Sequence, residues 1–345
     1  MRIKKGWLWG IVGLAGVVAI GLFSTGITLY SWIYRPSLIY TDKDTLLFHV
    51  RSDEGFDQVY KNLSNSGWFR SDRGLLWVAE KKRYSELVKP GRYTFERGMS
   101  NTEVIDLLRS GRQTEVNLVF NTTRTFERIA GVVGRQIEPD SLEILELLTD
   151  QAVYEELGFP WEQRFALFIP DTYRLFWTAT PREFIDRMKI EYDRFWNDAR
   201  KTRAAEIGLT PFDVVTIASI VQEETVKVDE MASVAGVYMN RIKRGMRLQA
   251  DPTVIFALQD PTIRRVLHRH LKVDSPYNTY RIKGLPPGPI RIPSREAIEA
   301  SLNYESHRYL YFCAREDFSG YHAFAEDYRE HLQNARRYQR ALEKR

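Results

Sequence analysis

A run of residues without a single charge extends from Gly6 to Tyr34, near the start of this 345-residue chain. It is longer than the roughly 20 apolar residues that an α-helix needs to cross the hydrocarbon core of a bilayer. Aromatic residues gather at both of its ends, where the interfacial belts of a spanning helix lie. They are Trp7 and Trp9 at one end and Tyr30, Trp32 and Tyr34 at the other. The sequence therefore predicts a membrane span over residues 6–34, within an anchor segment of residues 1–35.

The charges that flank this run predict its orientation. Arg2, Lys4 and Lys5 precede it, and basic residues next to a span favour the cytoplasmic side. We therefore expect a single-pass protein of the cell inner (cytoplasmic) membrane, with a cytoplasmic N-terminus and all residues after Arg35 extracytoplasmic or periplasmic. The alternative is a cleaved signal peptide. It is less favoured, because the run exceeds the roughly 7–15 apolar residues of a signal peptide and no A-x-A-like cleavage site follows.

The rest of the chain has the composition of folded, globular domains. Hydrophobic residues make up 43% and charged residues 28%, and the length allows two or three folding units. The single cysteine, Cys313, excludes an intrachain disulfide framework and a cysteine-rich metal site. A formal net charge of +5 is too dilute over this length to indicate a nucleic-acid partner, and none is expected.

A small α+β unit is predicted over residues 36–120. Hydrophobic periodicity and turn signals give it alternating strands and helices, with a boundary near Asn121. The predicted elements are a strand at 45–50, a helix capped by Asp53 and ending near Gly67, a helix at 71–83, a strand at 92–95, a helix capped by Ser100 and stopped by Gly111, and a strand at 115–120.

A second, helix-rich unit is predicted over residues 121–345. Apolar residues recur there at helical spacing over 125–136, 140–149, 181–208, 211–228 and 229–244, and the charged tail from residue 325 is predicted to be a terminal helix. The expected fold class is therefore α+β: one N-terminal transmembrane helix, a small α+β module and a larger helix-rich α+β domain.

Glu224 is the first candidate for chemistry. In the predicted helix over 211–228, one stripe of the helical wheel is apolar, and Glu224 falls on the edge of that stripe while Glu223 points to the opposite side. Burial disfavours the charged form of a carboxyl, so its pKa rises and it can hold a proton near neutral pH, as a general acid must. The alternative, which periodicity alone favours, is a helix-end glutamate paired with Lys227 or an arginine. The stripe consists of Val214, Ile217, Ala218, Val221, Thr225 and Val228.

Two downstream segments hold further polar candidates. One places Asn240, Arg241, Gln249 and Asp251 around a glycine turn; before Pro252, Asp251 is also a good helix N-cap. The other combines Tyr277 and Tyr280 with Asn278 and a Gly/Pro-rich turn, which suits stacking on sugar rings but equally suits a packed loop.

Other chemistries find little support in the sequence. His268 and His270 have no third ligand or HExxH pattern, so a solvated pair is favoured and neither a metal nor a cofactor is expected. There is no glycine-rich phosphate loop and no G-x-S-x-G motif, and His322 has no evident serine or cysteine partner.

Taken in order, these motifs resemble those of the membrane-anchored endolytic murein transglycosylases, also called the YceG-like family. The resemblance runs from the anchor to near His322. The motifs are KPGRYTF at 89–95, FIPDTY at 168–173, ASIVQEET at 218–225, NRIKRGMRLQADPTVIFAL at 240–258 and YNTYRIKGLPPGPI at 277–290. The family pattern A-S-I-[IV]-E-[KR]-E assigns catalysis to its final glutamate, which is Glu224 here. This chain departs from it with Gln222 and Glu223.

The resemblance implies a LysM-like first module, a catalytic second domain, and cleavage of the β-1,4 bond between N-acetylmuramic acid and N-acetylglucosamine within nascent peptidoglycan strands. The products would carry 1,6-anhydro ends, and strand elongation would stop. It implies that glycan strands are the substrate and that peptidoglycan synthases are partners. It also implies a cleft lined by residues that match the motifs: Ser219, Asn240, Gln249, Asp251, Tyr277, Asn278 and Tyr280.

Two alternatives stay open. One is a hydrolytic muramidase in which Asp251 serves as the base that activates a water molecule. The other is a non-catalytic wall-binding anchor that positions synthases. The mass of the products separates the first from a transglycosylase, and the absence of new chain ends identifies the second.

Overall fold

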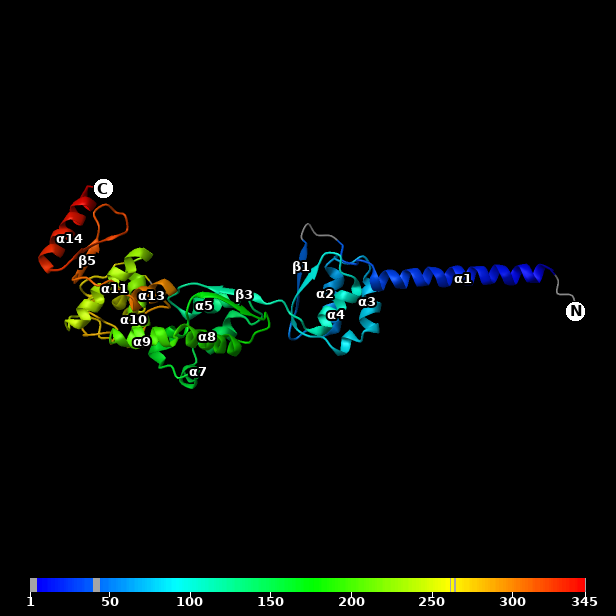
Figure 1. The fold of residues 1–345 in the computed structure, drawn as a ribbon, viewed down its shortest axis with the longest axis horizontal. Coiled ribbons are helices and arrows are strands. Elements are labelled where there is room, and N and C mark those ends of the chain that lie inside the picture. The colour runs from blue at the N-terminus through cyan, green and yellow to red at the C-terminus, as the bar shows by residue number, and fades with distance from the viewer. Residues whose placement is uncertain (1–4, 40–43, 261, 264, 345) are drawn as a thin grey trace. The chain divides into compact units, whose positions relative to one another are not determined.

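The computed structural model of this chain describes residues 5–39, 44–260, 262–263 and 265–344 (Figure 1). The chain divides into two compact units. The first comprises Met1–Val116 with Arg174–Thr178, and the second Asn117–Tyr173 with Ala179–Arg345. Helices dominate, and the sheets of the described residues, β1–β2, β3–β4 and β5–β6, have two strands each. The predicted helix-rich α+β class is confirmed.

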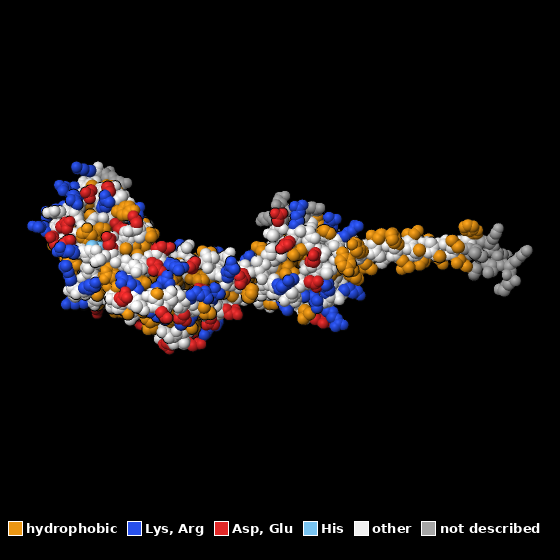
Figure 2. Space-filling model, in the orientation of Figure 1, with side chains coloured by type: hydrophobic (Ala, Val, Ile, Leu, Met, Phe, Trp, Pro, Cys, Tyr) orange, Lys and Arg blue, Asp and Glu red, His pale blue; other side chains and the backbone are white. Residues whose placement is uncertain are grey.

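The uncharged N-terminal run forms one helix, α1 (Lys5–Tyr34). Among the described residues, α1 is the single unbroken helix that is long and apolar enough to cross a membrane, over Trp9–Tyr34. Its hydrophobic side chains from Trp9 to Ile27 are exposed (Figure 2). Arg2 and Lys4, on which the predicted orientation depends, lie outside the described residues, as does the side chain of Trp7.

The C-terminal end of α1 packs against the rest of the first unit. The Trp32 ring lies 6.2 Å from the ring of Trp77, centroid to centroid, and the Trp32 carbonyl accepts a hydrogen bond of 3.0 Å from Asn101 Nδ2. Gly74 leaves room for this contact, because a Cβ atom there would lie 2.7 Å from the Trp32 ring. The helix is therefore fixed to the folded part of its own unit.

The first unit is built on a two-stranded antiparallel sheet. Alternation along the strands directs Phe48 and Val50 of β1, and Tyr93 and Phe95 of β2, into a core shared with the helices. The elements after α1 are β1 (Thr45–Val50), α2 (Phe56–Asn65), α3 (Asp72–Lys81), the 3₁₀ turn η1 (Tyr84–Glu86), β2 (Gly91–Glu96) and α4 (Asn101–Ser110).

Local signals predicted most of these boundaries. Ser100 forms a capping box with Glu103, and Gly111, at φ +70°, ends α4, as predicted. The prediction that Asp53 caps α2 was wrong: Gly55 is the N-cap residue, and Asp53 forms an ion pair of 3.1 Å with Arg51. The last predicted strand forms, as β3 (Val116–Phe120), but it pairs with β4 (Asp171–Leu175), and the first unit ends at Val116.

A helix whose middle is fully buried, α10, lies at the core of the second unit. In α10 every residue from Val214 to Val221 is buried, and the helix packs against α11 and α13. The remaining elements of this unit are α5 (Phe126–Val133), α6 (Ser141–Leu148), α7 (Gln151–Glu156), η2 (Trp161–Leu167), α8 (Pro181–Phe195), α9 (Asp198–Glu206), α10 (Pro211–Glu224), α11 (Val228–Lys243), α12 (Asp251–Leu258), η3 (His270–Lys272), α13 (Arg295–Leu302), β5 (Tyr311–Ala314), β6 (His322–Ala325) and α14 (Tyr328–Glu343).

Three predictions for this unit were wrong. The helix predicted over 181–208 is two helices, because Asn197 caps α9 by accepting a hydrogen bond from the amide of Arg200. The helix predicted over 211–228 ends at Glu224, where Thr225 turns to extended backbone (φ −141°, ψ 144°) and accepts from the amide of Lys227. The third error is the single apolar stripe. Residues on all sides of α10 from Val214 to Val221 are buried, which is usual for a helix that is apolar all round.

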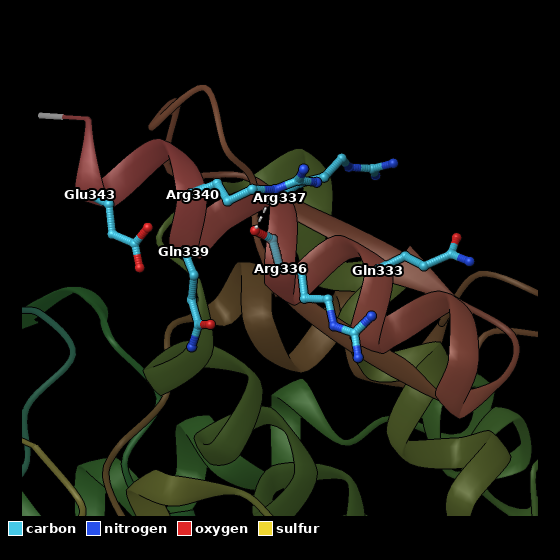
Figure 3. A pocket seen from close by; sticks show the side chains of 6 residues that line it. All are labelled: Gln333, Arg336, Arg337, Gln339, Arg340 and Glu343. Carbon is cyan, nitrogen blue, oxygen red and sulfur yellow. Dashed lines mark hydrogen bonds between the residues drawn. The ribbon is translucent and has the colours of Figure 1, made fainter.

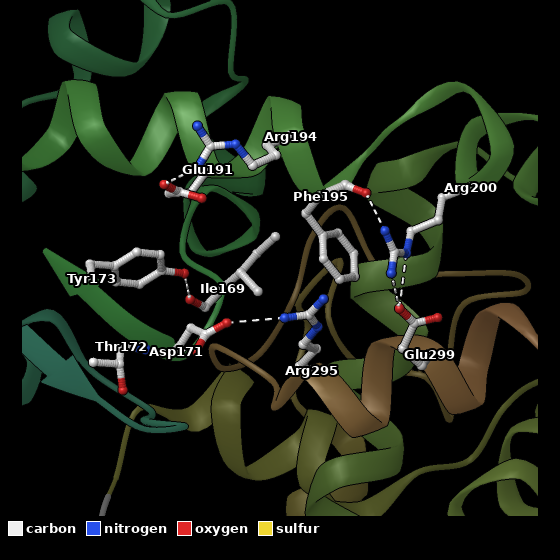
Figure 4. Close-up of polar contacts among 10 residues, drawn as sticks. All are labelled: Ile169, Asp171, Thr172, Tyr173, Glu191, Arg194, Phe195, Arg200, Arg295 and Glu299. Carbon is white, nitrogen blue, oxygen red and sulfur yellow. Dashed lines mark hydrogen bonds and ion pairs between the residues drawn. The ribbon is translucent and has the colours of Figure 1, made fainter.

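The FIPDTY segment fastens β4 to the helices around α10 (Figure 4). Asp171 forms an ion pair of 3.0 Å with Arg295 at the start of α13, and the Tyr173 hydroxyl donates to the carbonyl of Ile169. On α9, Arg200 pairs with Glu299 of α13 at 2.6 Å. These contacts fix α13, and α13 covers one side of α10.

Candidate active site around Glu224

Glu224 is the last residue of α10, and its side chain is half-buried. Its Oε1 atom accepts a hydrogen bond of 2.8 Å from the hydroxyl of Tyr238, which lies on the neighbouring helix α11. Tyr238 is itself only 2% exposed. The carboxyl is therefore held at a helix end, by a buried donor, with part of its surface open.

The surroundings of Glu224 favour its protonated form. Burial is the main cause, and it raises the pKa of the carboxyl to about 7. The hydrogen bond from Tyr238 and the charge of Arg241 oppose this shift, while the carboxylates of Asp251 and Glu223 add to it. A carboxyl with this pKa can either donate or accept a proton near neutral pH.

The neighbouring Glu223 has a different role. Its carboxylate is bound by Arg124, with Nε at 2.6 Å from Oε1, and by Arg291, with Nη1 at 2.7 Å from the same atom. Its side chain is only 9% exposed. The alternative of an ion-paired helix-end glutamate thus describes Glu223 and not Glu224, while Lys227 lies over the ring of Tyr321.

A buried arginine lies close to the same carboxyl. Arg241 is 8% exposed and donates from Nε to the carbonyl of Leu310 at 2.6 Å and from Nη1 to that of Leu248 at 2.7 Å. Burial lowers its pKa, but a guanidinium keeps its charge in proteins. Its positive charge acts on Glu224, Tyr238 and Tyr280.

Asp251 and Tyr280 form a polar pair beside Glu224. The Tyr280 hydroxyl donates to Oδ1 of Asp251 at 2.6 Å, and both residues act electrostatically on Glu224. The interpretation of Asp251 as a helix N-cap was wrong, because Ala250 is the N-cap residue of α12 and Asp251 follows it. Its carboxylate is exposed and available to a ligand.

Gln249 and Tyr277 flank this pair. Gln249 is exposed and has a left-handed backbone (φ +51°), and its backbone N–H donates to the carbonyl of Thr279. Tyr277 is half-buried, with its ring 4.7 Å from that of Phe256, centroid to centroid. Because Thr279 also bonds Ala250 at 2.9 Å, the two segments predicted to line a cleft are joined directly.

Three other predicted ligand residues are used for structure. Ser219 is fully buried; it donates to the carbonyl of Thr216 and accepts from the amide of Ile290. Asn278 is also fully buried, and bonds the carbonyls of Leu271 and Val273. Neither can reach a ligand in this structure, because its polar atoms already have protein partners.

Asn240 is half-buried and binds the main chain ahead of β5. Its Nδ2 donates to the carbonyls of His307 and Tyr309, at 2.8 and 3.0 Å. It therefore orders this segment rather than presenting its amide to a cleft.

Sequence reasoning missed Tyr238. A signal was present, since Met231, Val234, Tyr238 and Arg241 recur at helical spacing, which indicates a buried face, and a buried tyrosine hydroxyl usually finds a partner. The sequence also gave His322 no partner, whereas its Nδ1 lies 2.8 Å from Oε2 of the buried Glu230.

A close main-chain approach predicts a large effect at Gly288. A Cβ atom there would lie 1.9 Å from the carbonyl oxygen of Glu162, so the loop from Gly284 to Pro293 cannot keep its path. We expect Gly288→Ala to lower the free energy of unfolding by about 2 kcal/mol in chemical denaturation. Gly131→Ala is the control, because a Cβ there meets only a side-chain atom of Arg135 at 3.7 Å. Equal stability of the two variants would contradict this reading.

A pocket elsewhere in the second unit is lined by residues other than those around Glu224. An open pocket of about 550 Å³ lies on the outer face of α14 (Figure 3). It is lined by Gln333, Arg336, Arg337, Gln339, Arg340 and Glu343, and none of these belongs to the cluster around Glu224. Among the described residues there is no group of three or more His, Cys, Asp or Glu side chains that could hold a metal ion.

Comparisons with known proteins agree with the motifs. Residues 48–337 match the YceG-like family. An endolytic murein transglycosylase of Bacillus subtilis (strain 168) is 26% identical over 336 residues, which cover 92% of this chain and 90% of that protein. One of Streptococcus pneumoniae serotype 2 (strain D39) is 28% identical over 289 residues, and this chain spans about half, 52%, of its length. A crystal structure of a YceG-like protein of Listeria monocytogenes has the same fold, with a TM-score of 0.53 at 22% identity over 85% of this chain and 99% of that one.

Proposed function

The chain belongs to the YceG-like family, and on that premise we propose that it is a membrane-anchored lytic transglycosylase of peptidoglycan. Its substrate would be the glycan strand, cut internally at the β-1,4 bond between N-acetylmuramic acid and N-acetylglucosamine. The observation that carries the proposal is Glu224, a half-buried carboxyl whose pKa is raised to about 7, within a cluster of polar side chains. The names of the curated relatives supply the substrate class.

In the proposed mechanism Glu224 serves both steps. As an acid it protonates the oxygen that leaves the muramoyl C1 atom, and that C–O bond breaks through an oxocarbenium-like state. As a base it then takes the proton of the muramoyl C6 hydroxyl, whose oxygen bonds to C1 and closes the 1,6-anhydro ring. The proton that Glu224 lost is thereby restored, and no water is consumed. A pKa near 7 suits a group that must change its protonation state twice in each turnover.

The residues around Glu224 would bind the sugars. Tyr280 and Tyr277 offer partly exposed aromatic rings, and Asp251 and Gln249 offer exposed polar groups. Ser219, Asn240 and Asn278 would act indirectly, by holding the loops that carry these residues. Of the seven predicted cleft residues, four thus remain proposed ligands of the glycan.

Product mass tests the reaction. We expect purified glycan strands incubated with the full chain in detergent to give fragments with anhydro-muramoyl ends, which are lighter by one water molecule than hydrolysis products. Products carrying the added water would favour the hydrolytic alternative, with the exposed carboxylate of Asp251 as base. An absence of new chain ends would favour a non-catalytic anchor.

The apolar helix α1 supports a location for the proposed reaction outside the cytoplasm. We infer that α1 spans the inner membrane with its N-terminus in the cytoplasm, so that both units reach nascent strands and the synthases that make them. A periplasm-dependent reporter fused after Arg345 should be active, and a cytoplasm-dependent one inactive; the reverse result would contradict this topology. The order β1–α2–α3–β2 supports a LysM-like description of the first unit.

A further inference from the structure

We propose that Tyr238 is a positioning residue that reserves one oxygen of Glu224, Oε2, for proton exchange with the substrate. The inference rests on the proposed function, because it concerns how the acid and base of that reaction is presented. Its starting point is the hydrogen bond of 2.8 Å from the Tyr238 hydroxyl to Oε1. That bond leaves Oε2 as the oxygen without a bond to Tyr238.

The phenol cannot easily turn away. Tyr238 is 2% exposed in the middle of α11, and the Phe312 ring meets its ring edge-on, with centroids 6.0 Å apart. The backbone of α11 is also fixed, because a Cβ atom at Gly236 would lie 2.5 Å from the carbonyl oxygen of Glu305. The hydroxyl therefore occupies a constant position relative to the end of α10.

A phenol has one proton, and this restricts the carboxyl. Among the described residues, the Tyr238 hydroxyl donates its hydrogen bond to Glu224. If the acid proton of Glu224 lay on Oε1, that oxygen would be a much weaker acceptor, and the buried phenol would be left with a weakened or lost hydrogen bond. The cost of a buried donor without a partner favours protonation of Oε2 by roughly tenfold or more.

The same bond is present in both halves of the reaction. A donated hydrogen bond stabilises the carboxylate more than the acid, so it eases the first proton transfer to the leaving oxygen. Burial and the nearby carboxylate of Glu224 raise the pKa of Tyr238 well above its ordinary value, so the phenol stays a donor throughout. Oε2 would then release the proton and recover it, while Oε1 stays bound to Tyr238.

Other charged and titratable groups also face Glu224. Asp251 of α12 and Glu223 of α10 raise its pKa, whereas Arg241 of α11 lowers it. Tyr280 lies near too, and it is neutral at the pH of the reaction because burial raises its pKa. A change at Tyr238 leaves all of these in place, so its effect on the titration of Glu224 can be read separately.

Tyr238→Phe tests the inference in the full chain in detergent. We expect kcat to fall by about 10- to 100-fold, because the carboxyl loses its fixed orientation. The apparent pKa of the alkaline limb of kcat/KM should rise, because a bond that stabilises the carboxylate is gone. KM should stay the same, since the buried Tyr238 does not face the glycan. Tyr154→Phe is the control: Tyr154 is fully buried and donates to the carbonyl of Leu148 at 2.9 Å, so it loses a similar hydroxyl without touching the site.

A second substitution keeps the test independent of folding. Replacing Tyr238 by 3,5-difluorotyrosine retains the hydroxyl and makes it a stronger donor, so the alkaline limb should move to lower pH, opposite to the shift in Tyr238→Phe. An unchanged limb, or one that moves to higher pH, would overturn the role of Tyr238. If Glu224→Gln is inactive, a Tyr238→Phe variant with the kcat and pH profile of the wild type would also overturn the role of Tyr238. If Glu224→Gln kept full activity, the proposed function itself would fail.

Discussion

Replacing Glu224 by glutamine is expected to lower the release of anhydro-ended fragments by at least about 10³-fold, since in the proposed mechanism this one side chain carries both proton transfers. Glutamine has nearly the shape of glutamate, and its oxygen can still accept the hydrogen bond from Tyr238. It has no proton to donate to the leaving oxygen and cannot take one from the C6 hydroxyl. The measurement is the rate of anhydro-end formation on purified strands, compared at equal protein concentration.

The matched control is Glu299→Gln. Glu299 pairs with Arg200 at 2.6 Å on α13, and its side chain is 35% exposed, so losing this charge should cost at most about 1 kcal/mol and leave the rate unchanged. Circular dichroism of both variants should match that of the wild type. Undiminished formation of anhydro ends by Glu224→Gln would remove Glu224 from the mechanism.

The second large effect is on stability and depends on pH. The folded protein raises the pKa of Glu224 from 4.5 to about 7, so the folded state holds this proton more tightly than the unfolded state does. The stability linked to this group is complete below pH 4.5 and is lost as the pH rises through 7. At 1.36 kcal/mol per pH unit, the loss amounts to about 3 kcal/mol.

Comparison with Glu224→Gln isolates this contribution. We expect the difference in free energy of unfolding between that variant and the wild type to increase by about 3 kcal/mol from pH 4.5 to pH 8, with the variant gaining. Chemical denaturation of the full chain in one detergent measures it, and titrations elsewhere cancel in the difference. A difference that does not change with pH would show that burial leaves this carboxyl with an ordinary pKa.

Elements with local signals were predicted well. The capping box at Ser100 and the left-handed Gly111 bound α4 by interactions within a few residues, and the sequence contains all of them. The end of α10 lacked such a signal, because Thr225 and Lys227 are compatible with a continuing helix. The helix stops where Thr225 turns to extended backbone and its hydroxyl accepts from the amide of Lys227, a change that hydrophobic periodicity does not record, so the predicted continuation to Val228 was wrong.

The candidate site shows the same division. The prediction that Glu224 and Glu223 diverge followed from helical geometry alone. The partners of each, Tyr238 for one and Arg124 with Arg291 for the other, come from other elements and could not be deduced from spacing. Ser219 and Asn278 match the family motifs but are buried, since a motif records which residues are present and not whether they face the substrate or support the loop that does.

The packing of Trp32 against Trp77, with Asn101 bonded to the Trp32 carbonyl, couples α1 to the rest of the first unit. If α1 spans the bilayer, any tilt of this helix reorients the whole first unit by the same angle. A spanning helix adjusts to a thinner bilayer by tilting. The thickness of the surrounding membrane would then set which surface of the first unit faces the wall.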